Sequence, residues 1–144
     1  MSEKKSFVRE LIELILLAAV IVIPFRLFIA QPFIVDGTSM NPTFRDGQYL
    51  IVDEISYRFT EPERGSVIIF KYPKDPSKKF IKRIIGLPEE RVSINNGQVT
   101  ITNEENPEGL VLEEPYVKFP KTDFMEVQLD EGEYFVMGDN RTAS

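Results

Sequence analysis

The sequence predicts a mainly β domain with antiparallel, barrel-like sheets behind a single N-terminal helix of transmembrane length. Two observations predict this class. One apolar run near the N-terminus is long enough to cross a bilayer, and beyond residue 30 short β-rich runs alternate with turn residues. With 144 residues, the chain has room for one domain besides that helix.

The N-terminal helix is predicted over residues 11–29, where the apolar run reaches about the 20 residues that a bilayer-spanning helix needs. Its charged members Glu13 and Arg26 lie close to the two ends, where a long side chain can reach the interface. A cleaved secretory signal and a buried core helix are the alternatives, but no Ala-x-Ala cleavage site follows the run. We therefore expect an uncleaved transmembrane anchor.

Basic residues set the expected orientation of this anchor. Three of them precede the apolar run: Lys4, Lys5 and Arg9. Flanking basic residues favour the cytoplasmic side of a membrane. We therefore expect residues 1–10 in the cytoplasm, residues 11–29 in the bilayer, and residues 30–144 as one domain outside the cytoplasm.

Beyond residue 30 the apolar periodicity changes from helical to strand-like. Short runs rich in β-branched and aromatic residues are separated by turn residues at short intervals. We predict strands over residues 33–35, 49–55, 66–70, 79–86, 91–94, 98–102, 125–129 and 133–137. The dipeptide Asn96-Gly97 lies between two of these runs and predicts a type I′ hairpin turn.

Two charged stretches between the strands are predicted to be loops. Residues 71–79 are basic and residues 102–109 are acidic, and both are expected to be solvated. The alternative for the basic loop is contact with anionic lipid head groups, where each charge contributes about 1 kcal/mol.

Composition excludes several classes of chemistry. The chain has no histidine and no cysteine, which excludes a Ser-His-Asp triad, a cysteine nucleophile, a disulfide and the usual His/Cys zinc sites. Residues 31–144 carry a net charge of −7, which is unsuited to nucleic-acid binding. No glycine-rich phosphate loop is present. We therefore expect no metal, no cofactor and no nucleic-acid partner.

Ser39 and Lys82 are the residues whose surroundings point to chemistry. Ser39 lies in a Gly-Thr-Ser-Met-Asn-Pro-Thr loop, and without histidine a serine nucleophile needs a neutral lysine or a carboxylate as its base. Lys82 has apolar neighbours in a predicted strand, and burial among apolar side chains lowers a lysine pKa. Each residue alone also fits an ordinary turn serine or an exposed strand lysine, so both alternatives stay open.

Four segments of the chain, in order, resemble one protein family. GTSMNPT (37–43), RGSVIIFKYP (64–73), FIKRIIGLP (80–88) and MGDNRTAS (137–144) resemble successive motifs of the bacterial type I signal peptidases, the Ser-Lys leader peptidases, in their Gram-positive-like form. The resemblance extends from the apolar anchor to the last residue. It implies a serine endopeptidase of the bacterial cell membrane that cleaves signal peptides from secreted preproteins after small residues, in an Ala-x-Ala pattern.

The resemblance also implies roles for individual residues. Ser39 is expected to be the nucleophile and Lys82 the general base, with Ser144 orienting the lysine. Asp139 and Arg83 are expected to form an ion pair. The backbone N–H of Ser39 is expected to donate to the oxyanion.

Six apolar residues are expected from the resemblance to line shallow pockets for small side chains: Phe33, Val35, Met40, Leu50, Phe80 and Ile81. The signal peptide would lie as an extended strand beside residues 33–35 and 80–82, recognised mainly through its backbone. Each of the six residues is also an ordinary core candidate.

Two departures from the family pattern affect what the resemblance implies. Gly37 stands where many members have a serine that acts as a second oxyanion donor. The family's last motif normally continues past the residue matched by Ser144, so the resemblance predicts a catalytic domain that is incomplete at its C-terminus.

Two other functions stay open at this point. A repressor-type autoprotease also uses serine and lysine on β structure, but it would need a DNA-binding segment in place of the apolar anchor. A catalytically inactive, membrane-tethered β domain is the alternative without enzymatic activity, and the shortened last motif is its one supporting feature.

Overall fold

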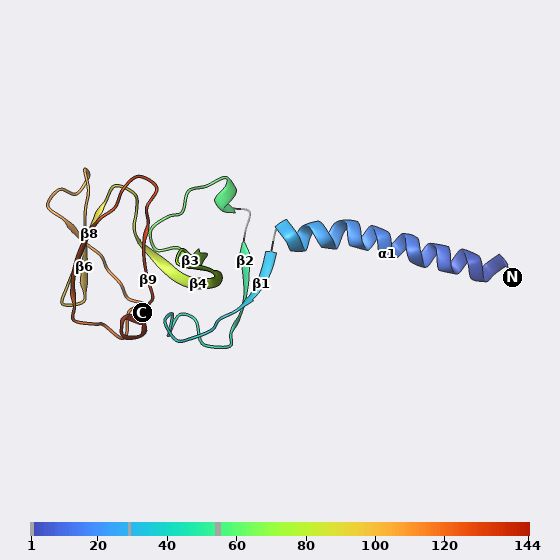
Figure 1. The fold of residues 1–144 in the computed structure, drawn as a ribbon, viewed down its shortest axis with the longest axis horizontal. Helices are drawn as coiled ribbons and strands as arrows, with labels where there is room; N and C mark the ends of the chain where they lie inside the picture. Colours follow the sequence, from blue (N-terminus) through green and yellow to red (C-terminus); the bar gives the residue numbers. More distant parts are fainter. Residues whose placement is uncertain (1, 29, 54–55) are drawn as a thin grey trace. The chain divides into compact units, whose positions relative to one another are not determined.

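The computed structural model describes residues 2–28, 30–53 and 56–144 (Figure 1). The chain divides into two compact units. Unit 1 comprises Met1–Phe33 and Leu50–Glu61, and unit 2 comprises Ile34–Tyr49 and Pro62–Ser144. All four segments that resemble family motifs lie in unit 2.

Unit 1 begins with helix α1 (Ser2–Phe28), which confirms that the apolar N-terminal run is helical. Within the described residues, no helix is both long enough and apolar enough to cross a membrane. The transmembrane anchor predicted over 11–29 is therefore not supported. Charged side chains lie within the described helix, where Arg9 Nε pairs with Glu13 Oε1 at 2.8 Å. Ile29, the last residue of the predicted anchor, lies outside the described part of the chain.

Strands β1 (Ala30–Ile34) and β2 (Tyr49–Asp53) form a two-stranded sheet, and a short 3₁₀ helix, η1 (Ser56–Arg58), follows. The strand predicted over 49–55 is confirmed as far as Asp53, while residues 54–55 lie outside the described residues. The strand predicted at 33–35 begins earlier, at Ala30.

Unit 2 contains two antiparallel sheets, which confirms the mainly β prediction. A three-stranded sheet has the order β3–β4–β9 and consists of β3 (Val67–Tyr72), β4 (Asp75–Gly86) and β9 (Phe135–Met137). A four-stranded sheet has the order β7–β6–β5–β8 and consists of β7 (Leu110–Val111), β6 (Gln98–Thr102), β5 (Arg91–Asn95) and β8 (Phe124–Gln128). The sequence does not predict β7, because two residues are too few to show a period-two pattern.

The hairpin predicted at Asn96-Gly97 is confirmed. The two residues have φ angles of 51° and 81°, as a type I′ turn requires. They join β5 to β6, and Asn95 lies opposite Gln98. The local preference of Asn-Gly for positive φ therefore sets the register of this strand pair.

The prediction of a loop over residues 71–79 is wrong. Strands β3 and β4 continue through most of it as a hairpin, and Lys71 lies opposite Lys79. Only Pro73 and Lys74 form the turn, because proline fixes φ at a value that suits a tight turn. The positive charge of this stretch lies on strand residues rather than on a free loop.

The hydrophobic core of unit 2 lies against the four-stranded sheet. Alternate residues of β5 and β6 are buried there: Val92, Ile94, Val99 and Ile101. Ile85 of β4 and Leu129 complete the buried cluster, and Phe135 of β9 packs against it. Gly86 leaves no room for a side chain, since a Cβ there would lie 2.5 Å from Val92 Cγ2. This core fixes β4, the strand that carries Lys82.

Glu90 is a buried carboxylate between β4 and β5, with 5% of its surface exposed. It accepts hydrogen bonds from Arg64 Nη2 (2.6 Å), the Leu87 amide (2.8 Å) and Asn103 Nδ2 (2.8 Å). Burial alone raises the pKa of Glu90, but these hydrogen bonds outweigh it and hold the pKa below its ordinary value. The stability that the ionised Glu90 contributes is therefore present near neutral pH and lost as the pH falls through the lowered pKa.

Replacement of Glu90 should show that this carboxylate stabilises unit 2. Glu90→Ala should lower the free energy of unfolding by about 2 to 3 kcal/mol at neutral pH, because Arg64 loses its partner while keeping some contact with water. The matched control is Glu126→Ala, which removes an exposed pair with Arg91 at 3.5 Å and should cost less than about 1 kcal/mol. Urea unfolding of both variants measures the difference, and equal losses would contradict the expectation.

Candidate active site

Lys82 lies on β4 opposite Ile68 of β3, and its side chain is half-buried. Its Nζ donates a hydrogen bond of 3.0 Å to Ser144 Oγ. Burial lowers the pKa of Lys82 below its ordinary value. At a given pH this lysine is therefore neutral more often than an exposed one, as a general base must be.

Ser39 lies in the loop between β1 and β2, and this loop is held by contacts of its own. The Gly37 amide donates to Asp46 Oδ1 at 2.7 Å, and Gly37 has a φ of 99°, which favours glycine. Met40 is 1% exposed and anchors the loop. Ser39 itself is half-buried, and among the described residues neither its Oγ nor its amide N–H has a hydrogen-bond partner.

Asn140, which follows β9, holds the Ser39 loop from its other side. The Asn140 amide donates to the Ser39 carbonyl at 2.9 Å. The Asn140 Nδ2 atom donates to the Thr38 carbonyl at 3.2 Å. These two bonds position the backbone of the candidate nucleophile without using its amide or its hydroxyl.

Gly138 brings the Ser39 loop and Ser144 together. Its amide donates to Ser144 Oγ at 2.9 Å. A Cβ on Gly138 would collide with the Ser39 carbonyl and lie 2.7 Å from Ser144 Oγ, so only glycine fits this position. Because Lys82 is bonded to the same Ser144 oxygen, Gly138 and Ser144 link the Ser39 loop to Lys82.

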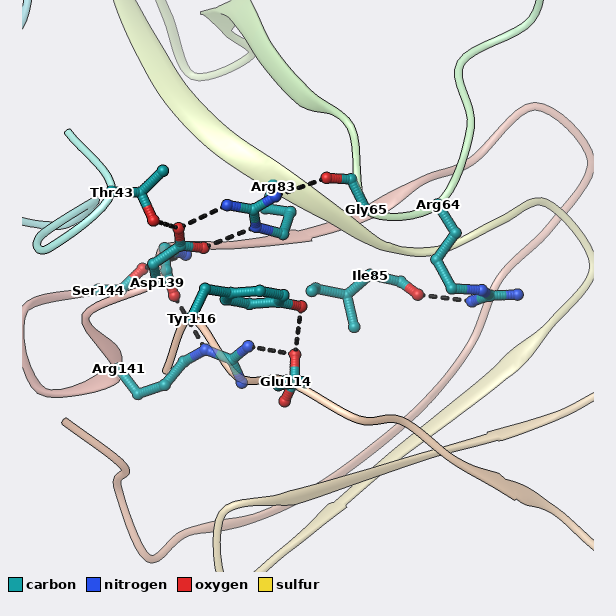
Figure 2. A network of polar contacts seen from close by, with 11 residues as sticks. Thr43, Arg64, Gly65, Arg83, Ile85, Glu114, Tyr116, Asp139, Arg141 and Ser144 are labelled. Atoms are coloured by element: carbon teal, nitrogen blue, oxygen red, sulfur yellow. Dashed lines mark hydrogen bonds and ion pairs between the residues drawn. The ribbon is translucent and has the colours of Figure 1, made fainter. Parts of the chain in front are cut away.

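Arg83 and Asp139 form the expected ion pair, drawn in Figure 2. Arg83 donates through Nε to Oδ1 (2.9 Å) and through Nη2 to Oδ2 (2.7 Å), a two-point contact. Asp139 is fully buried and also accepts a hydrogen bond from Thr43 Oγ1. The hydrogen bonds to Asp139 raise the pKa of Arg83 above its ordinary value. The pair therefore joins β4, the Ser39 loop and the segment after β9.

A second polar group lies beside this pair (Figure 2). The Arg83 Cζ atom lies 4.0 Å from the centroid of the Tyr116 ring, a cation–π contact. Tyr116 Oη donates to Glu114 Oε1 at 2.9 Å, and Arg141 Nη2 donates to the same oxygen at 2.5 Å. Burial, and then the charge of Glu114, raise the pKa of Tyr116, so its hydroxyl stays protonated.

Sequence reasoning assigned no role to several of these residues. Thr43, Gly138, Asn140 and Arg141 lie within GTSMNPT and MGDNRTAS, so their place in a motif was the available signal. Glu114 and Tyr116 lie in a segment without a motif or a periodic pattern. Only the tertiary structure brings those two residues to the site.

The six residues predicted to bind substrate fall into separate groups. Val35 and Met40 are 5% and 1% exposed. Both are therefore core residues, which was the alternative to a substrate-binding role. Phe33 and Leu50 belong to unit 1. Phe80 and Ile81 lie on β4, just before Lys82.

Strand β4 has a free edge at Phe80 and Ile81. Along these residues β4 pairs with β3, whereas its pairing with β9 on the other side begins at Arg83, opposite Met137. Phe80 is 36% exposed, and Ile81 is half-buried. This edge therefore presents backbone groups that no described strand occupies.

Several known proteins are similar to this chain over most of its length. The family model for signal peptidase, peptidase S26, matches residues 8–144. A probable signal peptidase I-1 of Synechocystis sp. (strain PCC 6803) is 37% identical over 146 residues, which cover 96% of this chain and 72% of the relative. Signal peptidase I U of Bacillus subtilis (strain 168) is 33% identical over 153 residues, which cover 99% of this chain and 78% of the relative.

Among solved structures, a crystal structure of a signal peptidase I from Enterococcus faecalis V583 is 28% identical, covers 59% of this chain and 82% of its own, and has a TM-score of 0.49. The family match and the similar sequences agree with the resemblance carried by the four motifs. The chain belongs to the signal peptidase family, peptidase S26.

Proposed function

We propose that this protein is a serine endopeptidase that removes N-terminal signal peptides from secreted preproteins, with Ser39 as nucleophile and Lys82 as general base. Membership of the signal peptidase family supports the reaction and the substrate class. One observation carries the assignment of the site. The half-buried Lys82 is bonded to Ser144 Oγ, and both Ser144 and the Ser39 loop lie against Gly138.

Acylation begins when neutral Lys82 accepts the proton of Ser39 Oγ. The serine oxygen attacks the carbonyl carbon of the scissile peptide bond and forms a tetrahedral oxyanion. The C–N bond then breaks as Lys82 gives its proton to the leaving amine of the mature protein. Water then gives a proton to Lys82 and attacks the ester carbonyl. The bond between the carbonyl carbon and Ser39 Oγ breaks as Lys82 returns this proton to the serine oxygen, which releases the signal peptide and restores both side chains.

Ser144 supports the lysine in this role. Its oxygen accepts hydrogen bonds from both Lys82 Nζ and the Gly138 amide, which fixes the amino group of Lys82 close to the Ser39 loop. Because Ser39 Oγ has no partner among the described residues, rotation about its Cα–Cβ bond is free to bring it to Lys82 when a substrate binds. Catalytic hydrogen bonds commonly tighten only in the complex with substrate.

The Ser39 amide supports an oxyanion hole. A backbone N–H without an acceptor in the protein is available to donate to the oxyanion that develops on the substrate carbonyl. Gly37 does not supply a second donor, because it has no side chain and its own amide is bonded to Asp46. The amide of Ser39 is therefore the donor that we assign.

The free edge of β4 supports the binding of the signal peptide as an extended strand. An added strand would use main-chain hydrogen bonds beside Phe80 and Ile81 for affinity. Alternate side chains of an extended peptide point to the same face. The two alanines of an Ala-x-Ala pattern would therefore lie on one face of the bound peptide.

Replacement of either dyad residue should abolish cleavage. Ser39→Ala and Lys82→Met should each lower kcat/KM for a model preprotein by roughly 10⁴-fold or more, and the double variant should be no worse, because the two groups act as a unit. The control is Lys78→Met, since Lys78 is an exposed lysine of the same strand that pairs with Asp75. Substantial cleavage by the Lys82 variant in a gel assay would exclude the dyad.

The pH profile should report the lowered pKa of Lys82. Because burial disfavours the ammonium form, kcat/KM should rise with pH through a pKa below the ordinary lysine value of 10.5. The measurement is preprotein cleavage against pH, with circular dichroism showing that the fold is intact at each pH. An activity that rises only at the pKa of an ordinary lysine would contradict the assignment.

We also propose that α1 holds the enzyme at the bacterial cell membrane, where secreted preproteins emerge. The four consecutive residues Leu14–Leu17 are apolar and 58% to 63% exposed, and together they cover a full turn of the helix. An apolar helix surface of this kind favours lipid over water. The cytoplasmic N-terminus that the basic residues indicate stays a prediction.

Removal of this apolar turn should release the enzyme from membranes. A variant with serine at all four positions of Leu14–Leu17 should move from the membrane fraction to the supernatant, because its helix loses the apolar surface that lipid contacts. Phe124→Ser is the control, since Phe124 is 73% exposed but lies on β8 in unit 2. Fractionation of cell lysates measures the change, and a four-residue variant that stays in the membrane fraction would count against the proposal.

A further inference from the structure

Glu114 and Arg141 form a buried ion pair next to the active site. Their side chains are 8% and 4% exposed, and Arg141 Nη2 lies 2.5 Å from Glu114 Oε1. The Nε atom of the same guanidinium donates to the Gly138 carbonyl at 2.9 Å. Arg141 therefore joins Glu114 to the glycine that lies against both the Ser39 loop and Ser144.

Tyr116 connects Glu114 to the strand of Lys82. The Tyr116 hydroxyl donates to Glu114 Oε1 at 2.9 Å, and its ring lies under Arg83, the residue after Lys82 (Figure 2). One carboxylate oxygen thus accepts hydrogen bonds from two sides of the site. Movement of Glu114 would release both contacts together.

We propose that Glu114 is a positioning residue of the active site, which holds Arg141 and residues 138–141 (the Gly138 turn) in place and neutralises a buried guanidinium that is bonded to Gly138. This inference rests on the proposed function. Glu114 touches none of the reacting groups, so it acts through Arg141 and Tyr116. Its influence should appear both in the rate and in the protonation of the base.

The charges of Glu114 and Arg141 predict the direction in which each substitution shifts the pKa of Lys82. Arg141 cannot lose its proton, so without Glu114 an uncompensated cation remains bonded to Gly138, whose amide donates to the same Ser144 oxygen as Lys82. A nearby cation disfavours the ammonium form and lowers a lysine pKa, whereas an uncompensated carboxylate raises it. Loss of Glu114 and loss of Arg141 should therefore shift the pKa of Lys82 in opposite directions.

The charge of Arg83, the residue after Lys82, is compensated. Arg83 is bonded to Asp139, and Tyr116 stays protonated. The neighbouring strand β3 places the apolar Ile68 opposite Lys82. A single substitution in the Glu114–Arg141 pair therefore changes the charge balance of the site without replacing Ser39, Lys82 or Ser144.

The experiment compares Glu114→Gln, Arg141→Gln and the double variant in the full chain. Each should lower kcat about tenfold, because the Gly138 turn is held less firmly. The acid limb of kcat/KM should move down by roughly half a pH unit in Glu114→Gln and up by a similar amount in Arg141→Gln. In the double variant the limb should return to its original position while kcat stays low.

Glu90→Gln is the matched control. Glu90 is equally buried and pairs with Arg64, but it does not contact Gly138 or Tyr116. This variant should lower thermal stability and leave the acid limb unchanged. If Arg141→Gln does not fold, the proposal stands or falls on whether Glu114→Gln shifts the limb downward while Glu90→Gln does not.

NMR titration of Lys82 in a Ser39→Ala background gives a second readout that needs no activity. Opposite shifts of the Lys82 pKa in the two single variants would support the proposal. Shifts of the same sign, or none, would overturn it and leave Glu114 with a purely structural role. An unmodified chain that fails to cleave preproteins would count against the proposed function alone, because the titration still tests Glu114.

Discussion

The arrangement of the active site depends on the buried ion pair between Arg83 and Asp139. Asp139 is fully buried, and a carboxylate in that position is stable only when its charge is balanced and its oxygens are hydrogen-bonded. The two-point contact with Arg83 and the hydrogen bond from Thr43 meet both conditions. Lys82 precedes Arg83 and Gly138 precedes Asp139, so this pair brings the candidate base and the Gly138 turn together.

Burial has to supply a base in a chain that lacks histidine. A lysine at the surface is almost always protonated at neutral pH, whereas desolvation moves its pKa toward the range where it accepts protons. The position of Lys82 on β4, opposite Ile68, provides that desolvation from the packing of the sheet. Loss of this packing would therefore raise the pKa of Lys82 and weaken the base. A histidine base does not depend on burial in this way, because its pKa lies near neutral pH in water.

The polar contacts around the site have different roles according to their distance from the dyad. Ser144 contacts the lysine directly, and Asn140 and Gly138 set the backbone of the Ser39 loop. Glu114 and Arg141 lie behind them as a buried, mutually neutral pair. A pair of this kind adds little net stability compared with apolar packing, but it is costly to break, and so it holds the turn in one position.

Local pattern was enough to predict most of the strands. The alternating residues of β5 and β6 and the Asn96-Gly97 turn encode a hairpin within a dozen residues, because side-chain period and turn geometry are local properties. Prediction was wrong for residues 71–79, where charge suggested a loop and the proline turn allowed strands to continue. The predicted membrane-spanning role of α1 was not supported either. Helix formation follows from the local sequence, whereas spanning a bilayer depends on apolar residues over the whole length of the helix.

The sequence by itself determined the chemical types at the site: a loop serine, a strand lysine and a final motif ending in Ser144, with no histidine or cysteine to compete. Only the tertiary structure decided which groups meet. The bond from Lys82 to Ser144, the close approach of Gly138 to the Ser39 carbonyl, and the contacts of Glu114 join segments that are far apart in the chain. Such pairings leave no trace in local periodicity, because they arise when sheets pack and buried charges must find partners.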